Sequence, residues 1–169
     1  MDLKIIKQNC NDYLRARKKF LEFAKSAQAQ GLLNGNDNII GSRIGEFIAW
    51  ELLNDQKRNP KINTINNTRD FDLMADLDKT KVTVKLISSE NRTGRTTRLG
   101  NDWDEFILIL LDEKYKIKLI GQISKKEFET ARKLNLRRCE NPIVSRTMLN
   151  ENGLFKFGKI HKKILEKYL

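Results

Sequence analysis

A block of alternating and wholly apolar segments in the middle of the chain constrains the fold most strongly. Residues 70–77 alternate between apolar and polar side chains, and residues 81–87 resume this period after a turn predicted at 78–80. These two segments predict a β-hairpin. Residues 105–111 are nearly all apolar, which is typical of a strand buried on both faces. A further strand is predicted at 115–120, so the centre of the chain is expected to form a sheet.

Helices are predicted on both sides of this block. Residues 11–30 carry apolar side chains at three- and four-residue steps, and we expect these to form the inner face of a helix: Tyr13, Ala16, Phe20, Phe23, Ala24 and Ala27. A second helix is expected over 42–54, with a stripe made of Ile44, Phe47, Ile48 and Leu52. A capping box opens a third helix, whose inner face is expected to hold Phe128, Ala131 and Leu134.

The tail is expected to add short strands at 141–145 and 154–160 and a helical segment at 161–168. The order of these elements predicts an α/β fold in which helices flank a mixed central sheet. No linker or repeat divides the chain, so we expect one domain. It would consist of an N-terminal helical segment (1–40), a core (41–135) and a basic C-terminal extension (136–169).

Composition excludes several classes of protein. No apolar run approaches the roughly 18–20 residues that a membrane-spanning helix needs, and the N-terminus lacks the pattern of a secretory signal. We therefore expect a cytoplasmic protein without a membrane span. Cys10, Cys139 and the single histidine, His161, are too few for a disulfide scaffold or a typical structural zinc site.

The net charge of +11 is unevenly distributed. Residues 61–90 hold five basic and five acidic residues, whereas residues 91–169 hold 18 basic and 10 acidic residues. A basic surface favours polyanions such as nucleic acid, although a surplus of this kind also serves solubility alone. Charge alone does not distinguish DNA from RNA.

The predicted hairpin carries the candidate chemistry. Thr83 and Lys85 share one face of their strand, and the hairpin can bring Asp72 to that same face. The second helix can then lay Glu46 across it. Two carboxylates beside a lysine suit phosphodiester hydrolysis, because carboxylates hold Mg²⁺, for which Mn²⁺ can substitute, and an ammonium stabilises developing negative charge. Asp76 is a reserve metal ligand.

These residues resemble a known family. The segments 41–46, 70–73 and 82–85, with the following strand, resemble the PD-(D/E)XK nuclease superfamily, which includes type II restriction endonucleases and Holliday-junction resolvases. The resemblance covers residues 41–121 and implies a restriction-endonuclease-like fold. It implies that Glu46 is the helix carboxylate, Asp72 the metal-bridging aspartate and Lys85 the catalytic lysine.

Thr83 departs from the family pattern, which usually has an acid two residues before the lysine. A hydroxyl is a poorer Mg²⁺ ligand than a carboxylate, and the helix carboxylate Glu46 is the candidate to compensate for it. We expect a Mg²⁺-dependent endonuclease acting on double-stranded DNA, with a type II restriction enzyme as the leading role. The alternatives are a structure-selective repair or recombination nuclease and a DNA-binding relative without turnover. A homodimer, and a cognate DNA methyltransferase in the same system, would fit the leading role.

Two basic segments are candidate DNA contacts. The first follows the lysine strand and holds Arg92, Arg95 and Arg98, spaced by Gly and Thr, which suits contacts to phosphates or guanine edges. The second lies near the C-terminus and includes Arg137, Arg138 and Arg146. The alternative interpretations are a surface loop and a solvated basic face.

Overall fold

The structure is a computed structural model that describes residues 2–29, 43–63, 71–134 and 142–162. Its helices are α1 (Leu3–Ala29), α2 (Arg43–Asp55) and α3 (Lys125–Leu134), with 3-10 turns η1 (Arg146–Leu149) and η2 (Leu154–Phe157). Its strands are β1 (Pro60–Ile62), β2 (Leu73–Ala75), β3 (Thr80–Ile87), β4 (Arg95–Arg98), β5 (Glu105–Leu111), β6 (Ile117–Ser124), β7 (Ile143–Ser145) and β8 (Lys159–His161). The predicted α/β class is confirmed.

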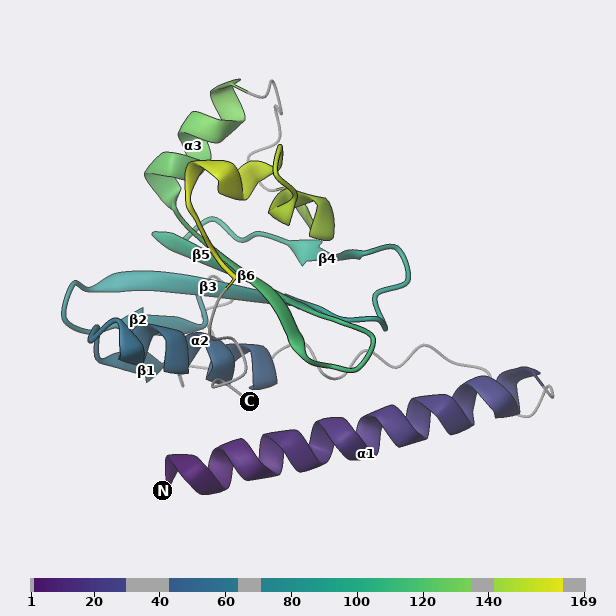
Figure 1. Cartoon of the computed structure of the whole chain (residues 1–169). Helices are drawn as coiled ribbons and strands as arrows, with labels where there is room; N and C mark the ends of the chain where they lie inside the picture. Colours follow the sequence, from purple (N-terminus) through teal and green to yellow (C-terminus); the bar gives the residue numbers. More distant parts are fainter. Residues whose placement is uncertain (1, 30–42, 64–70, 135–141, 163–169) are drawn as a thin grey trace.

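Six of these strands form one mixed sheet in the order β1-β2-β3-β5-β6-β8 (Figure 1). All its neighbouring strands are antiparallel except β3 and β5, which run parallel from Val82 opposite Glu105 to Ile87 opposite Leu110. The remaining two strands, β4 and β7, pair with each other in a separate ribbon. The sheet is therefore mixed but mostly antiparallel.

Each face of the sheet is covered by its own apolar layer. On β3, Val82, Val84 and Leu86 face the layer that contains α2. The alternate residue Ile87 faces the layer that contains α3 and the two 3-10 turns. The residues of β5 alternate between the same two layers and most are fully buried, as expected for its apolar sequence.

Helix α2 packs closely on the sheet because its first turn carries a glycine. A Cβ at Gly45 would lie 3.2 Å from Cβ of Leu86 and 3.7 Å from a methyl group of Val84. The predicted stripe of this helix is confirmed, since its four members are all buried. At the other side of α2, the indole N–H of Trp50 donates a 2.8 Å hydrogen bond to the carbonyl of Pro60.

The predicted inner face of the first helix is wrong. Tyr13, Phe20 and Phe23 are 42%, 48% and 62% exposed, and α1 begins at Leu3 rather than near residue 11. The buried residues of α1 lie on a neighbouring face and include Leu14 and the charged Arg17. The helix has two apolar stripes, and the one that contains Leu14 and Leu21 packs on the protein.

Other expectations need smaller corrections. The hairpin turn lies at residues 76–79, so it begins two residues earlier than predicted, and Leu77 there is 71% exposed. Tyr115 belongs to the next turn, with φ of +59°, and its ring is buried in the core instead of starting a strand. In α3, Leu134 is 66% exposed rather than on the inner face.

The capping box is confirmed, because the Ser124 hydroxyl donates to the Glu127 carboxylate at 2.7 Å and accepts the Glu127 N–H. In the tail, the strand predicted at 141–145 corresponds to β7. The segment 154–160 is a 3-10 turn followed by β8. Most of the helix predicted at 161–168 lies outside the described residues. No helix in the described part of the chain is long and apolar enough to cross a membrane.

Candidate active site and basic cleft

Asp72 directly precedes β2 and lies beside β3. Its N–H donates a hydrogen bond to the carbonyl of Val82 on β3 at 2.9 Å. The side chain of Asp72 contacts β3 as well, because its Oδ2 accepts hydrogen bonds from the Val84 N–H at 2.6 Å and from the Thr83 hydroxyl at 3.4 Å. The expected pairing of Asp72 with Thr83 is therefore present.

Lys85 shares a strand face with Thr83, as alternation requires. Thr83 is 3% exposed, whereas Lys85 is half-buried and forms no ion pair with the residues that the structure describes. The same face of β3 therefore carries the buried Thr83 hydroxyl, which contacts Asp72, and the half-buried Lys85.

Glu46 reaches this region from a different direction. It lies in the first turn of α2, directly after Gly45, and α2 packs on the Val84 and Leu86 face of β3. Helix α2 thus covers the face opposite to Thr83 and Lys85, contrary to the expected arrangement. A role for Glu46 beside Asp72 stays a prediction.

The reserve ligand Asp76 is engaged elsewhere. Its carboxylate contacts the ammonium groups of Lys61 and Lys79, each at 2.7 Å. Hydrogen bonds from these two lysines lower the pKa of Asp76 to about 2. The residue therefore stabilises the β2–β3 turn, and two positive charges already balance its carboxylate.

The fit of Mg²⁺ to this site depends on Asp72. In the described part of the chain, no three His, Cys, Asp or Glu side chains are grouped so that they could hold a metal ion. A carboxylate has about four acceptor positions, and within the described residues both hydrogen bonds to the Asp72 carboxylate go to Oδ2, so Oδ1 is the oxygen that could bind a cation. This donor set suits a cation that keeps most of its waters and takes further ligands from a phosphate, as Mg²⁺ does.

A polar cluster that the sequence did not predict lies beyond the C-terminal end of α2. Arg58 donates to both oxygens of Glu105 at 2.9 Å, and Gln122 donates to one of them at 2.9 Å. His161 contacts the Gln122 side chain at 3.0 Å. Burial, followed by the charge of Lys159, lowers the pKa of His161. These groups satisfy one another, so the cluster reads as a structural one.

The first arginine segment forms the loop after β3 and then β4. Gly94 has φ of +63°, and a Cβ on it would lie 2.5 Å from Nε of Arg146. The Arg146 N–H also donates to the Gly94 carbonyl at 2.9 Å, and Arg95 pairs with Ser145 between β4 and β7. The structure thus brings Arg146 to the arginine segment. Arg137 and Arg138 lie outside the described residues.

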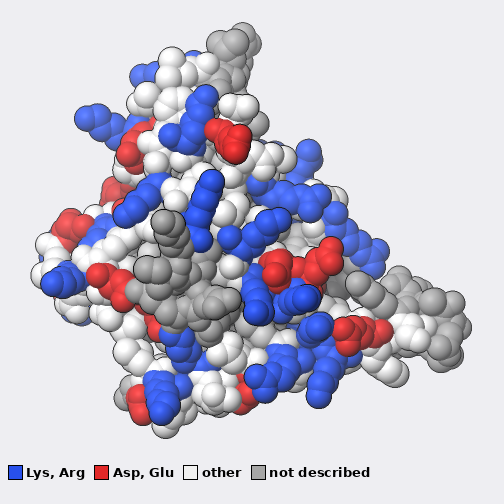
Figure 2. Space-filling view, viewed as in Figure 1, with Lys and Arg blue, Asp and Glu red and all other residues white. Residues whose placement is uncertain are grey.

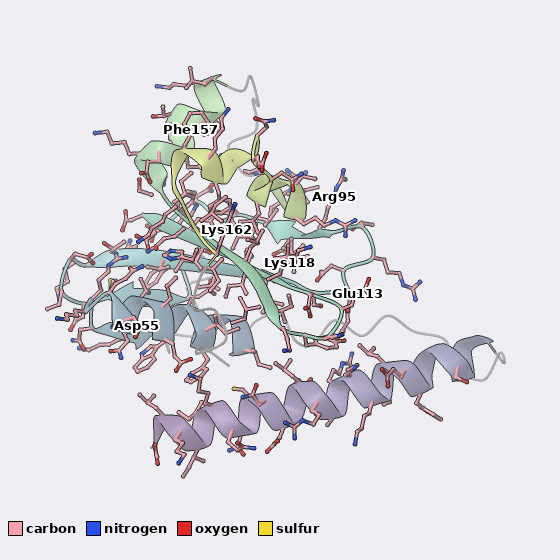
Figure 3. All side chains as sticks on the ribbon, viewed as in Figure 1. Asp55, Arg95, Glu113, Lys118, Phe157 and Lys162 are labelled. Carbon is pink, nitrogen blue, oxygen red and sulfur yellow. The ribbon has the colours of Figure 1, made fainter. Side chains whose placement is uncertain are left out.

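A cleft of about 650 Å³ opens beside this segment, at the carboxyl ends of the parallel strands β3 and β5. Its basic lining residues are Arg92, Lys114, Lys116, Lys118 and Arg146. The three lysines come from the β5–β6 turn and the start of β6, and the sequence analysis did not identify them. Figure 3 labels Lys118 and Arg95 on this flank of the sheet, together with Glu113.

The cleft carries uncompensated positive charge. None of its five basic side chains forms an ion pair within the described residues. Of its two acids, Glu113 is exposed, and Asp112 accepts the turn N–H groups of Lys114 and Lys116 at 2.7 and 2.9 Å. Figure 2 shows several Lys and Arg side chains on this flank of the surface, with some Asp and Glu side chains between them. A concave surface of this kind attracts polyanions.

The opposite end of the sheet differs in this respect. There Lys81 contacts Asp102 at 2.7 Å, and Arg58 contacts Asp78 at 2.9 Å. The positive charges around the β2–β3 turn are thus paired, whereas those of the cleft are not.

The sequence matches no model of a known protein family and no curated protein sequence.

Proposed function

We propose that this chain is an endonuclease that binds double-stranded DNA in the basic cleft and hydrolyses it with Mg²⁺ at Asp72 and Lys85. The observation that carries the proposal is that the Asp72 carboxylate lies against Thr83 on β3, the strand that also bears Lys85 and ends at the cleft. A restriction-endonuclease-like fold is part of the proposal. The antiparallel β1-β2-β3 unit, with β3 parallel to β5, is compatible with it.

The distances along β3 suit a bound DNA strand. Four residues separate Thr83 from Ile87 at the edge of the cleft, which is about 13 Å of extended strand. One strand of a DNA duplex places about four phosphates over that length along the helix axis. A backbone held by the cleft lysines therefore extends as far as Asp72 and Lys85.

Each residue then has a task. Asp72 would hold the cation through Oδ1 while its other oxygen fixes its position through the Val84 N–H. Bound Mg²⁺ lowers the pKa of a coordinated water and stabilises charge on the phosphate. The Thr83 hydroxyl restrains the Asp72 carboxylate, and the Lys85 ammonium stabilises negative charge on the attacked phosphate.

A second candidate is a DNA-binding protein without turnover. The 2.6 Å hydrogen bond from Val84 to Asp72 gives this carboxylate a structural task that needs no metal, and Thr83 stands where the family usually has an acid. In that case the cleft alone performs the function.

Cleavage of supercoiled plasmid with Mg²⁺ or Mn²⁺ distinguishes the two. The wild type is expected to nick or linearise the plasmid, with loss of cutting in Asp72→Asn and a decrease of about 10²–10³-fold in Lys85→Met. Asp76→Asn and Lys79→Met are matched controls, because these side chains pair with each other at the turn, and they should retain cutting. Binding without nicking by the wild type would establish the second candidate.

Substrate choice separates the biological roles. Discrete fragments from linear duplex DNA would indicate restriction, and a gene for a DNA methyltransferase next to that of this chain would support it. Preferential cutting of four-way junctions would indicate a repair or recombination nuclease.

The cleft is tested by binding. Lys116→Ala combined with Lys118→Ala should weaken duplex binding. The plot of log binding constant against log salt concentration should become less steep, by about 2 in the magnitude of its slope. Lys61→Ala combined with Lys79→Ala removes the same charge from paired lysines and should change the slope little. Equal slopes for the two double variants would exclude the cleft as the binding surface.

A further inference from the structure

The apolar stripe of α1 that points away from the protein forms a regular seam. The outer seam is defined here as the residues at alternating steps of three and four along α1: Ile6, Asn9, Tyr13, Ala16, Phe20 and Phe23. This is the spacing of the core positions in a coiled coil. Its three aromatic members are all exposed, and Phe23 reaches 62% exposure.

Within the described part of the chain, five of the six seam residues are exposed, and Ile6 alone is partly buried. The contacts of α1 with the rest of the protein run through an adjacent face of the helix, which holds Lys7, Cys10, Leu14, Arg17 and Leu21. Figure 1 shows α1 along the margin of the molecule, with its outer side open. Three exposed aromatic rings on one stripe of a surface helix mark an interaction site.

We propose that the outer seam binds the outer seam of a second copy of this chain, with the two α1 helices antiparallel. In such a pair, Tyr13 of one copy packs against Ala16 of the other, and Phe23 packs against Ile6. Large side chains thus face smaller ones. The helix has 27 residues and is about 40 Å long, which is enough for six such contacts.

Charges beside the seam select this alignment. Asp12 and Lys19 occupy equivalent flanking positions seven residues apart, and both are exposed. In the proposed alignment, Asp12 of each copy lies opposite Lys19 of the other, which gives two attractive contacts related by the twofold axis. Asp12 contacts only Gln8 and Arg15 of its own helix among the described residues, and its side chain remains 52% exposed.

The alternative alignments place like charges together. Sliding one helix by seven residues in one direction brings Lys19 opposite Lys19, and sliding it in the other direction brings Asp12 opposite Asp12. A parallel pair would need Arg17 as the partner of Asp12. The guanidinium of Arg17 is already bound to Glu90 at 3.0 Å and its side chain is 8% exposed, so it is not accessible.

Charge reversal tests the pairing and its alignment together. Asp12→Lys or Lys19→Asp alone turns two attractive contacts into two repulsive ones and should raise the dimer dissociation constant by roughly tenfold. The double variant Asp12→Lys/Lys19→Asp should return it to within about threefold of the wild type. Sedimentation velocity over a concentration series measures all four proteins, and circular dichroism confirms that their helix content is unchanged.

A second set of variants tests the seam. Phe20→Ser combined with Phe23→Ser should be monomeric, whereas Lys18→Ser combined with Glu22→Ser, an exposed pair outside the seam, should remain dimeric. A wild type that is monomeric at high micromolar concentration would overturn the proposal. The same holds if this monomer binds anionic lipid vesicles, because the seam would then bind a membrane surface and not a second copy. A dimer whose dissociation constant ignores the charge reversals would overturn the antiparallel alignment.

Discussion

Removing the buried arginine of α1 should destabilise the protein more than any exposed charge substitution. Nη2 of Arg17 contacts Oε2 of Glu90 at 3.0 Å, and these side chains are 8% and 5% exposed. The Tyr115 hydroxyl donates a hydrogen bond to Oε1 of Glu90 at 3.1 Å. Arg17→Met keeps most of the aliphatic bulk and leaves the Glu90 carboxylate buried without its counter-ion.

The expected cost follows from the burial of the pair. Breaking a buried ion pair on one side typically costs about 3–5 kcal/mol, whereas an exposed pair contributes about 0–1 kcal/mol. For a chain of this size, such a loss lowers the melting temperature by about 10 °C. Lys18→Met is the matched control on the same helix, because its pair with Glu22 is exposed and 3.7 Å long.

Urea unfolding of Arg17→Met, Glu90→Gln and the double variant gives the coupling between the two residues. We expect the double variant to be less destabilised than the sum of the single variants, by about 1–3 kcal/mol, because it contains no unpaired buried charge. If Arg17→Met cost less than about 1 kcal/mol, or if the two substitutions were additive, the docking of α1 through this pair would be refuted.

Three further predictions concern the packing. Burial, followed by the charge of Glu90, raises the pKa of Tyr115 to about 12. The unfolded chain loses this proton first, so unfolding free energy should fall by up to about 3 kcal/mol between pH 10 and 12. Tyr115→Phe should remove this component in urea titrations, and equal pH dependence of both proteins would contradict it. Gly121→Ala places a Cβ 2.5 Å from Phe155 and should cost about 1–3 kcal/mol by thermal unfolding; an unchanged melting temperature would exclude this contact. Phe128→Ala should cost about 3–5 kcal/mol, and Leu134→Ala less than about 0.5, since the first is buried and the second exposed; similar costs would mean that α3 is rotated.

The two central strands β3 and β5 were predictable, because the pattern of their side chains indicates which faces are buried. The alternation in β3 and the apolar run in β5 each allow one arrangement with a buried core. The face of α1 was not predictable in this way. Its sequence offers two apolar stripes, and the choice is made by Glu90, which lies 73 residues away and pairs with Arg17. Hydrophobic periodicity predicts that an arginine faces solvent, so it does not predict the burial of Arg17 against Glu90.

The candidate site was predictable where it depends on a single hairpin. The pairing of Asp72 with Thr83 follows from alternation and a short turn. The cleft depends instead on segments that are distant in sequence: the loop after β3, the β5–β6 turn and Arg146. The lysines of that turn alternate with apolar residues, a pattern typical of an ordinary exposed strand. Their place in the cleft depends on the parallel pairing of β3 and β5, which brings the ends of both strands together.

The most direct test of the proposed function measures plasmid nicking and duplex binding on the same samples, for the wild type and Asp72→Asn with Mg²⁺. We predict that the wild type binds and nicks, and that Asp72→Asn binds with similar affinity but does not nick. Equal nicking by the two proteins, or binding without nicking by the wild type, would contradict a nuclease centred on Asp72.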